Sequence, residues 1–205
     1  NSAVDKTTIN NNISGTGAGF KIDINSPLAD LKGVWQTLGG DVDLATPASA
    51  VTLTGDFTID TQSGATPVNA GSVALRTLDG AFKLRIDATG GVGGLGGSIA
   101  LNGNIGVTTA LTQLDALTTD TIFMLAPSGK LLTDGPVALK AAVLGVNSQL
   151  GTMQTIDTEA DGAGNGGDVT LDVAIMTEVS GTSSQGILQI NTAPGVGGTA
   201  GKVTL

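Results

Sequence analysis

The chain has 205 residues, no cysteine, no histidine and a formal net charge of −9. The missing cysteines exclude a disulfide framework and a zinc–thiolate site, and the missing histidines exclude a Ser–His or Cys–His catalytic pair. The acidic balance, the scattered Lys and Arg and the scarcity of aromatic residues argue against nucleic-acid binding and against attraction to anionic membranes.

Glycine, threonine and aspartate dominate the composition. The chain contains 32 Gly and 28 Thr, and 16 of its 18 acidic residues are Asp. Threonine favours strands, whereas Gly and Asp favour turns. The shortage of Glu, Lys and Arg removes the residues that cover exposed helix surfaces. This composition predicts an all-β protein. No run of 18 apolar residues occurs, so we expect no membrane insertion.

Residues 1–38 are predicted to be an N-terminal segment or cap. They lack an initiator Met, and the chain ends on a repeat strand, so we expect a piece of a larger protein or a trimmed product. Residues 26–38 carry apolar residues at helical spacing, although Gly33 interrupts them. These residues are compatible with a short helix or with an irregular strand, and either could cover the end of a β-stack. For Trp35, a sugar-stacking platform is the functional alternative.

Residues 39–205 are predicted to be one continuous domain of repeats. In each copy, two small residues and a polar residue precede a short strand. The strand consists of a β-branched residue, any residue and leucine, a pattern called branched-x-leucine below. Five close copies occupy residues 39–44, 70–75, 96–101, 166–171 and 200–205, and residues 134–139 form a looser sixth. Repetition of this kind is typical of stacked architectures.

A second element precedes four of these copies. It consists of isoleucine, then Asp or Asn, then Thr or Ala, at residues 59–61, 86–88, 156–158 and 190–192. A linker rich in glycine follows it, and 13 or 14 residues separate the isoleucine from the next branched residue. Nearby segments such as residues 82–87 alternate apolar and polar, which is typical of a strand with one buried face. The unit is therefore predicted to be strand, glycine-rich turn, strand.

Near-identical strands favour a parallel β-solenoid over a β-sandwich, in which strands have distinct roles. In a solenoid, equivalent positions stack at about 4.8 Å. One interior ladder is predicted to contain Val42, Val73, Ile99, Val169 and Val203, with Leu44, Leu75, Leu101, Leu171 and Leu205 beside it. The repeat exceeds a three-sided coil of roughly 20 to 25 residues. Either the coils carry loops, or one repeat is about a coil and a half.

The motifs of residues 37–44, 51–56 and 59–61 resemble the repeats of large bacterial surface exoproteins of the filamentous-haemagglutinin-like and autotransporter-like class. Residues 97–106 and 109–114 share this resemblance, and residues 163–171 are similar to the glycine-rich connecting segments of that class. The resemblance implies a right-handed parallel β-helix, export to the cell surface, and an adhesive or structural role. It covers most of residues 36–205.

The acidic residues have two interpretations. Asp60, Asp87, Asp157 and Asn191 could stack into an acidic ladder, or they could cap turns by accepting backbone N–H groups. Asp157, Asp161 and Asp168 lie in an oxygen-rich, glycine-rich stretch and are candidate calcium ligands, with a solvated loop as the alternative. No catalytic cluster is predicted, and no other cofactor is expected.

The sequence thus predicts a non-enzymatic extracellular or cell-surface scaffold. It would be a segment of a bacterial adhesin or a building block of a surface filament or matrix. Expected partners are neighbouring repeats of a longer chain, further copies, or a host or matrix glycan or protein. Two alternatives are a surface-layer or fibre subunit joined by strand addition, and a glycan-binding or polysaccharide-active β-helix protein.

Overall fold

A computed structural model describes residues 6–44, 50–62, 68–147, 152–179 and 187–205. These residues form 18 strands and no helix, which confirms the all-β prediction. The strands are β1 (Lys6–Ile9), β2 (Ile13–Ala18), β3 (Ile22–Asp23), β4 (Leu28–Leu38), β5 (Val42–Leu44), β6 (Ala50–Asp60), β7 (Val73–Leu75), β8 (Thr77–Asp79), β9 (Lys83–Ala88), β10 (Ile99–Leu101), β11 (Gln113–Thr118), β12 (Thr121–Met124), β13 (Lys130–Leu132), β14 (Val137–Asn147), β15 (Met153–Asp157), β16 (Val169–Val179), β17 (Ile187–Asn191) and β18 (Val203–Thr204).

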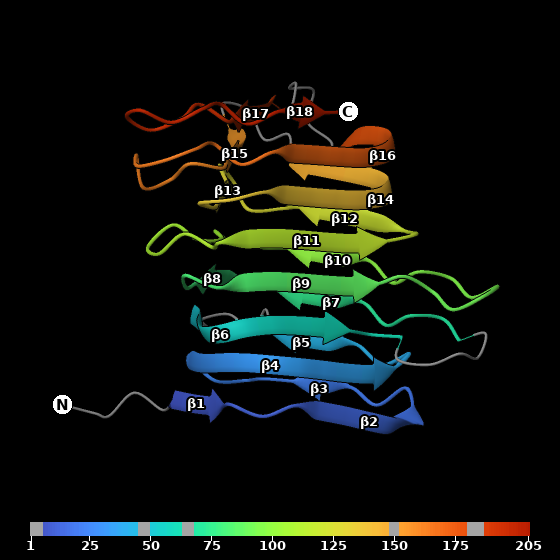
Figure 1. The fold of residues 1–205 in the computed structure, drawn as a ribbon. Helices are drawn as coiled ribbons and strands as arrows, with labels where there is room; N and C mark the ends of the chain where they lie inside the picture. Colours follow the sequence, from blue (N-terminus) through green and yellow to red (C-terminus); the bar gives the residue numbers. More distant parts are fainter. Residues whose placement is uncertain (1–5, 45–49, 63–67, 148–151, 180–186) are drawn as a thin grey trace.

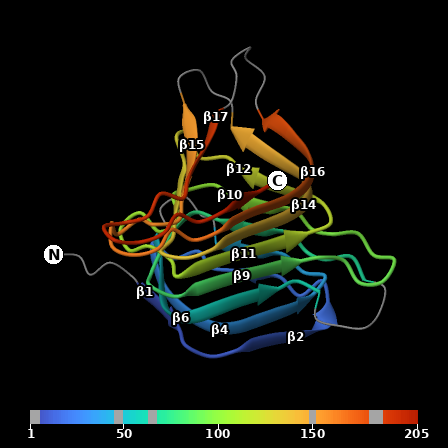
Figure 2. The ribbon, with the colours of Figure 1, turned by 45° about the horizontal axis from the view of Figure 1, so that its top comes forward.

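All ladders between these strands are parallel, and they form one large curled sheet and a small three-stranded sheet (Figures 1 and 2). The ladders define three stacks. Stack A contains β2, β9, β11, β18, the second halves of β4 and β6, and the first halves of β14 and β16. Stack B contains β3, β5, β7, β10, β12 and the second halves of β14 and β16.

Stack C contains β1, the first halves of β4 and β6, then β8, β13, β15 and β17, with Ile105 bridging β8 and β13. The chain visits the stacks in the order C, A, B, so each coil lies on the preceding one. This parallel arrangement is compatible with a β-helix or solenoid-like fold, and it differs from the antiparallel sheets of a sandwich.

The core lies between the three stacks and is filled by aliphatic side chains. In β9, for example, Leu84 and Ile86 are buried whereas Lys83 and Arg85 are exposed, as the period-2 pattern predicts. In-register pairing places like residues above one another, so Ile86 lies beside Ile59 of the preceding coil. The core therefore runs along the stack as continuous apolar ladders.

The predicted single ladder of repeat valines is wrong, because the repeats divide between two stacks. Val42, Val73 and Ile99 are register partners in stack B, together with Leu44, Leu75 and Leu101. Val169 and Val203, by contrast, follow Val137 in stack A. Leu171 belongs to stack A as well, beside Leu139. At the end of this row, Val203 is 42% exposed and Leu205 85% exposed, so neither is an interior residue.

The repeat motif changes stack because the long strands of the lower and upper coils pass through different corners. In the lower coils β4 and β6 run from stack C into stack A without a break, and glycine-rich linkers join stack A to stack B (Figure 1). In the upper coils β14 and β16 run from stack A into stack B, and the linkers join stack C to stack A. The same sequence unit is therefore used at two different corners.

Residues 28–38 form a strand, so the irregular-strand alternative is confirmed and the short helix is wrong. The irregularity is a register shift between Leu31 and Gly33 in the ladder with β6. Gly33 has a φ of +99°, a conformation that favours glycine. The region before residue 39 contributes β1 to β4, which pair within the same sheet.

Candidate functional site

The polar residues of the repeat gather at the corners that follow each isoleucine. The hydroxyl of Thr61 donates to the Gly71 carbonyl at 2.7 Å, and that of Thr158 donates to the Gly167 carbonyl at the same distance. Thr192 and Gly201 make the equivalent bond at 3.0 Å. The first two pairs lie at different corners of the coil, yet the bond is the same. We call this arrangement the Thr–Gly corner.

The Asp or Asn before each threonine completes the turn. Its Oδ1 accepts the backbone N–H two residues later, at 3.0 to 3.2 Å. The residues that do so are Asp60, Asp87, Asp157 and Asn191. This geometry is a local turn cap, so the structure supports the capping interpretation of these residues.

One copy of the unit lacks the threonine, and a neighbouring coil supplies it. Ala88 occupies the threonine position of residues 86–88 and is fully buried. Thr118, its register partner in β11, donates from its hydroxyl to the Gly97 carbonyl at 2.6 Å. The Gly97 carbonyl therefore receives its hydrogen bond from a threonine of the neighbouring coil.

A second set of Asp and Asn side chains ties each coil to the next. Asp41 Oδ1 accepts from the Ser72 N–H at 2.8 Å, and Asp168 Oδ1 accepts from the Lys202 N–H at 2.7 Å. The same contact is made by Asn12, Asp56, Asn69, Asp79, Asn104, Asp134 and Asn165. These side chains hold turns in register, because each accepts an N–H from the following coil.

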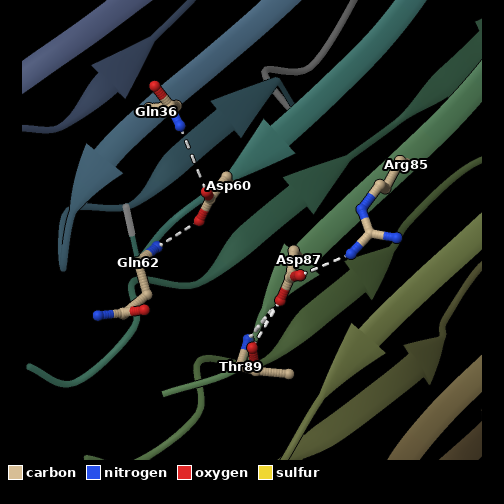
Figure 3. Close-up of polar contacts among 6 residues, drawn as sticks. All are labelled: Gln36, Asp60, Gln62, Arg85, Asp87 and Thr89. Carbon is tan, nitrogen blue, oxygen red and sulfur yellow. Dashed lines mark hydrogen bonds and ion pairs between the residues drawn. The ribbon is translucent and has the colours of Figure 1, made fainter. Parts of the chain in front are cut away.

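The predicted acidic ladder consists of two separate pairs. Asp60 and Asp87 are register partners in stack A, as Figure 3 shows. Gln36 donates to Asp60 Oδ2 at 3.5 Å and Arg85 forms an ion pair with Asp87 at 2.8 Å. Asp157 pairs instead with Asn191 in stack C, where the Asn amide donates to Asp157 Oδ2 at 3.0 Å.

The three candidate calcium ligands each accept a hydrogen bond from the chain. Asp157 and Asp168 take part in the contacts given above, and Asp161 Oδ1 accepts the Ala163 N–H at 2.8 Å. Within the described ranges, no group of three or more acidic side chains is arranged to hold a metal ion. The calcium assignment stays a prediction without a coordinating cluster.

An acidic corner after β15 contains Asp134, Glu159 and Asp161, which interact electrostatically. Burial raises the pKa of Asp134, and the nearby Asp161 raises it further. Burial also raises the pKa of Glu159, together with a hydrogen bond from its side chain to Asp161. An open hollow of about 270 Å³ adjoins Asp134 and Asp161 and is otherwise lined mainly by residues 106–110.

Trp35 is not a sugar-stacking platform, because it is fully buried. Its ring and that of Phe57 make a T-shaped contact with centroids 4.9 Å apart, and the pair is part of the core of the lower coils. Two buried amides that sequence reasoning missed lie in the upper coils. Asn147 donates to the Leu125 carbonyl and Gln154 to the Ala126 carbonyl, both at 2.6 Å.

Comparison with protein-family models, curated proteins and solved structures found no match to this chain. No helix capable of crossing a membrane occurs in the described ranges. The repeated polar side chains described above act on the backbone of their own or the neighbouring coil, and this use is structural.

Proposed function

We propose that the chain is a right-handed parallel β-helix that serves as an extracellular scaffold at a bacterial surface. Its role would be structural or adhesive, within a surface adhesin, filament or matrix. The right-handed sense is favoured because connections between parallel strands of one sheet are right-handed in about 98% of cases. The supporting observation is that the repeated Thr, Asp and Asn residues hold turns and coils together.

A scaffold of this kind is suited to presenting binding loops to a partner. Its coil repeats along one axis, and its variable linkers extend sideways from the corners (Figure 1). Binding residues are commonly found on loops that a rigid framework positions. The linker of residues 89–98 is a candidate contact surface, because Val92 and Leu95 are 88% and 71% exposed at its tip.

The adhesive role is tested by coating beads with the chain and measuring retention on immobilised matrix proteins and on a glycan array. The variant Val92→Ser/Leu95→Ser removes the exposed apolar tip, and Ala74→Ser, on the outward face of β7, is the matched control. Retention of wild type and control, with loss in the tip variant, supports adhesion. Absence of retention on every surface contradicts adhesion and leaves only the structural role.

A second candidate is a filament subunit, because the last two described coils expose apolar residues. Ile175, Met176 and Ile187 are 58%, 49% and 55% exposed on β16 and β17. Strand addition at such an edge would continue the parallel stack. Sedimentation over a range of concentrations and electron microscopy test this, with Ile175→Lys as the disrupting variant and Val92→Lys as the control. Monomers at all concentrations contradict it.

A further inference from the structure

Two Asn–Gly pairs of the chain differ sharply in how their reacting groups are held. Asn102–Gly103 lies between β10 and the Ile105 bridge, and Asn165–Gly166 lies in the linker before β16. An asparagine followed by glycine can lose its side-chain amide, because the next backbone nitrogen attacks the side-chain carbonyl carbon. Glycine permits this attack since it has no Cβ to obstruct it.

Both groups needed for the reaction are engaged at Asn165. Its Oδ1 accepts the Thr199 N–H at 2.9 Å and the Thr199 hydroxyl at 3.1 Å. The nucleophile is held as well, because the Gly166 N–H donates to the Thr199 carbonyl at 2.9 Å. The Gly166 N–H bond must break before that nitrogen can attack, and the two bonds to Oδ1 fix the side chain in place, so this site is protected.

Neither group is engaged at Asn102. The side-chain amide of Asn102 and the N–H of Gly103 make no hydrogen bond with any residue of the described ranges. The backbone N–H of Asn102 donates to the Leu75 carbonyl at 2.8 Å, which holds only the preceding peptide unit. Asn102 is partly exposed, so water can reach the site.

The surroundings of Asn102 favour the acidic product. Leu101 is the register partner of Leu75, so Arg76 of the preceding coil lies next to Asn102 in the same row. The Arg76 guanidinium has no ion-pair partner among the described residues. A carboxylate at position 102 would supply one, as the ion pair between Lys140 and Asp172 does across two coils elsewhere.

We propose that Asn102 is a site of spontaneous deamidation in the folded protein. The Gly103 nitrogen bonds to Cγ of Asn102 and the Cγ–Nδ2 bond breaks. The side-chain NH2 group takes up the Gly103 N–H proton and leaves as ammonia, and a cyclic imide remains. Water then opens the imide to aspartate or isoaspartate. The isoaspartate would lengthen the chain at a tightly packed corner, where a Cβ added to Gly103 would come 2.6 Å from the Arg76 backbone. Aspartate is therefore the product that fits.

The test is incubation of the full chain in mildly alkaline buffer, folded and in denaturant, with peptide mass spectrometry over time. In the folded chain, conversion at Asn102 is expected to be about tenfold or more faster than at Asn165, the factor expected from the extra hydrogen bonds at Asn165. In denaturant the two rates converge, since each asparagine precedes a glycine. Equal rates in the folded chain, or conversion at Asn102 only after unfolding, overturn the proposal.

A second measurement tests the product. Asn102→Asp is expected to raise the denaturant midpoint relative to wild type, and the rise is expected to disappear in Asn102→Asp/Arg76→Gln. A midpoint that is unchanged or lowered in Asn102→Asp overturns the pairing with Arg76.

Discussion

Thr158 and Gly167 are joined by a hydrogen bond of 2.7 Å that closes the corner between stack C and stack A. Thr61 and Gly71 form a bond of the same length between stack A and stack B. The same Thr–Gly hydrogen bond thus closes two different corners of the coil. The unit is defined by its own hydrogen bonds, and the strands around it determine which corner it occupies.

Removal of a corner hydroxyl is expected to destabilise the fold. Thr61 is fully buried, and Thr61→Val leaves the Gly71 carbonyl without its donor. Loss of a buried partner costs about 1–3 kcal/mol of unfolding free energy, which urea denaturation would measure. Thr58→Val is the matched control, because Thr58 lies on the outward face of the same strand. Equal losses in both variants would show that the hydroxyl bond is not the cause.

The carboxylates that join coils are expected to act as hydrogen-bond acceptors. Asp168→Asn keeps an acceptor for the Lys202 N–H, whereas Asp168→Ala removes it. We expect the Ala variant to lose about 0.5–1.5 kcal/mol and the Asn variant clearly less. Hydrogen exchange at the Lys202 amide reports the bond directly. Equal exchange in both variants would contradict this role.

The glycine before each short strand is expected to be essential for close stacking of coils. A Cβ on Gly71 would overlap the backbone of Gly40 in the coil below. Gly71→Ala must therefore push two backbones apart, and we expect a loss of several kcal/mol. Gly17→Ala is the control, because nothing lies within 4 Å of its added Cβ. Thermal unfolding of both variants makes the comparison, and a mild effect at Gly71 would contradict the packing.

The acidic corner is expected to stabilise the folded chain more at low pH than at neutral pH. The raised pKa values of Asp134 and Glu159 mean that the folded chain binds protons more tightly there than the unfolded chain does. Their contribution is fully present below the ordinary values of 3.8 and 4.5, and it is lost as the pH rises through the raised values.

Glu159→Gln tests this sign, because the amide stays neutral. Relative to wild type, the variant is expected to gain stability as the pH rises from acid to neutral, and denaturation at several pH values would measure the difference. A difference that does not change with pH would contradict the assignment.

The sequence predicted the kind of strand and much of its packing, but not the change of stack. Alternation in residues 82–87 gave the buried face of β9 correctly, and the branched-x-leucine motif marked Val73 and Ile99, which are neighbours. The shift arises because β12 takes the place after β10 in stack B, whereas the strand of the next copy, residues 137–139, begins β14 in stack A. β12 follows a tight corner that needs no glycine linker, so it lacks the repeat motif. Its Ile122-x-Met124 pattern was the available signal.

The buried amides were missed for a different reason. Asn147 and Gln154 donate to carbonyls of residues 125 and 126, which lie 22 and 28 residues earlier in the chain. No local pattern marks such a contact, because its cause is the position of one coil on another. The same applies to Thr118, which replaces the hydroxyl absent at Ala88.

Equivalent repeat positions lie in two different stacks, and paired cysteines can test this arrangement because the chain has no cysteine of its own. Ala74→Cys/Ala100→Cys places thiols on outward register partners of stack B, whose strands lie about 4.8 Å apart, within the Cα–Cα range of a disulfide. Ala100→Cys/Ala138→Cys places thiols at the same repeat position, but Ala100 lies in stack B and Ala138 in stack A. Mild oxidation is expected to cross-link the first pair and not the second. A disulfide in the second pair, or none in the first, would contradict the arrangement of coils described above.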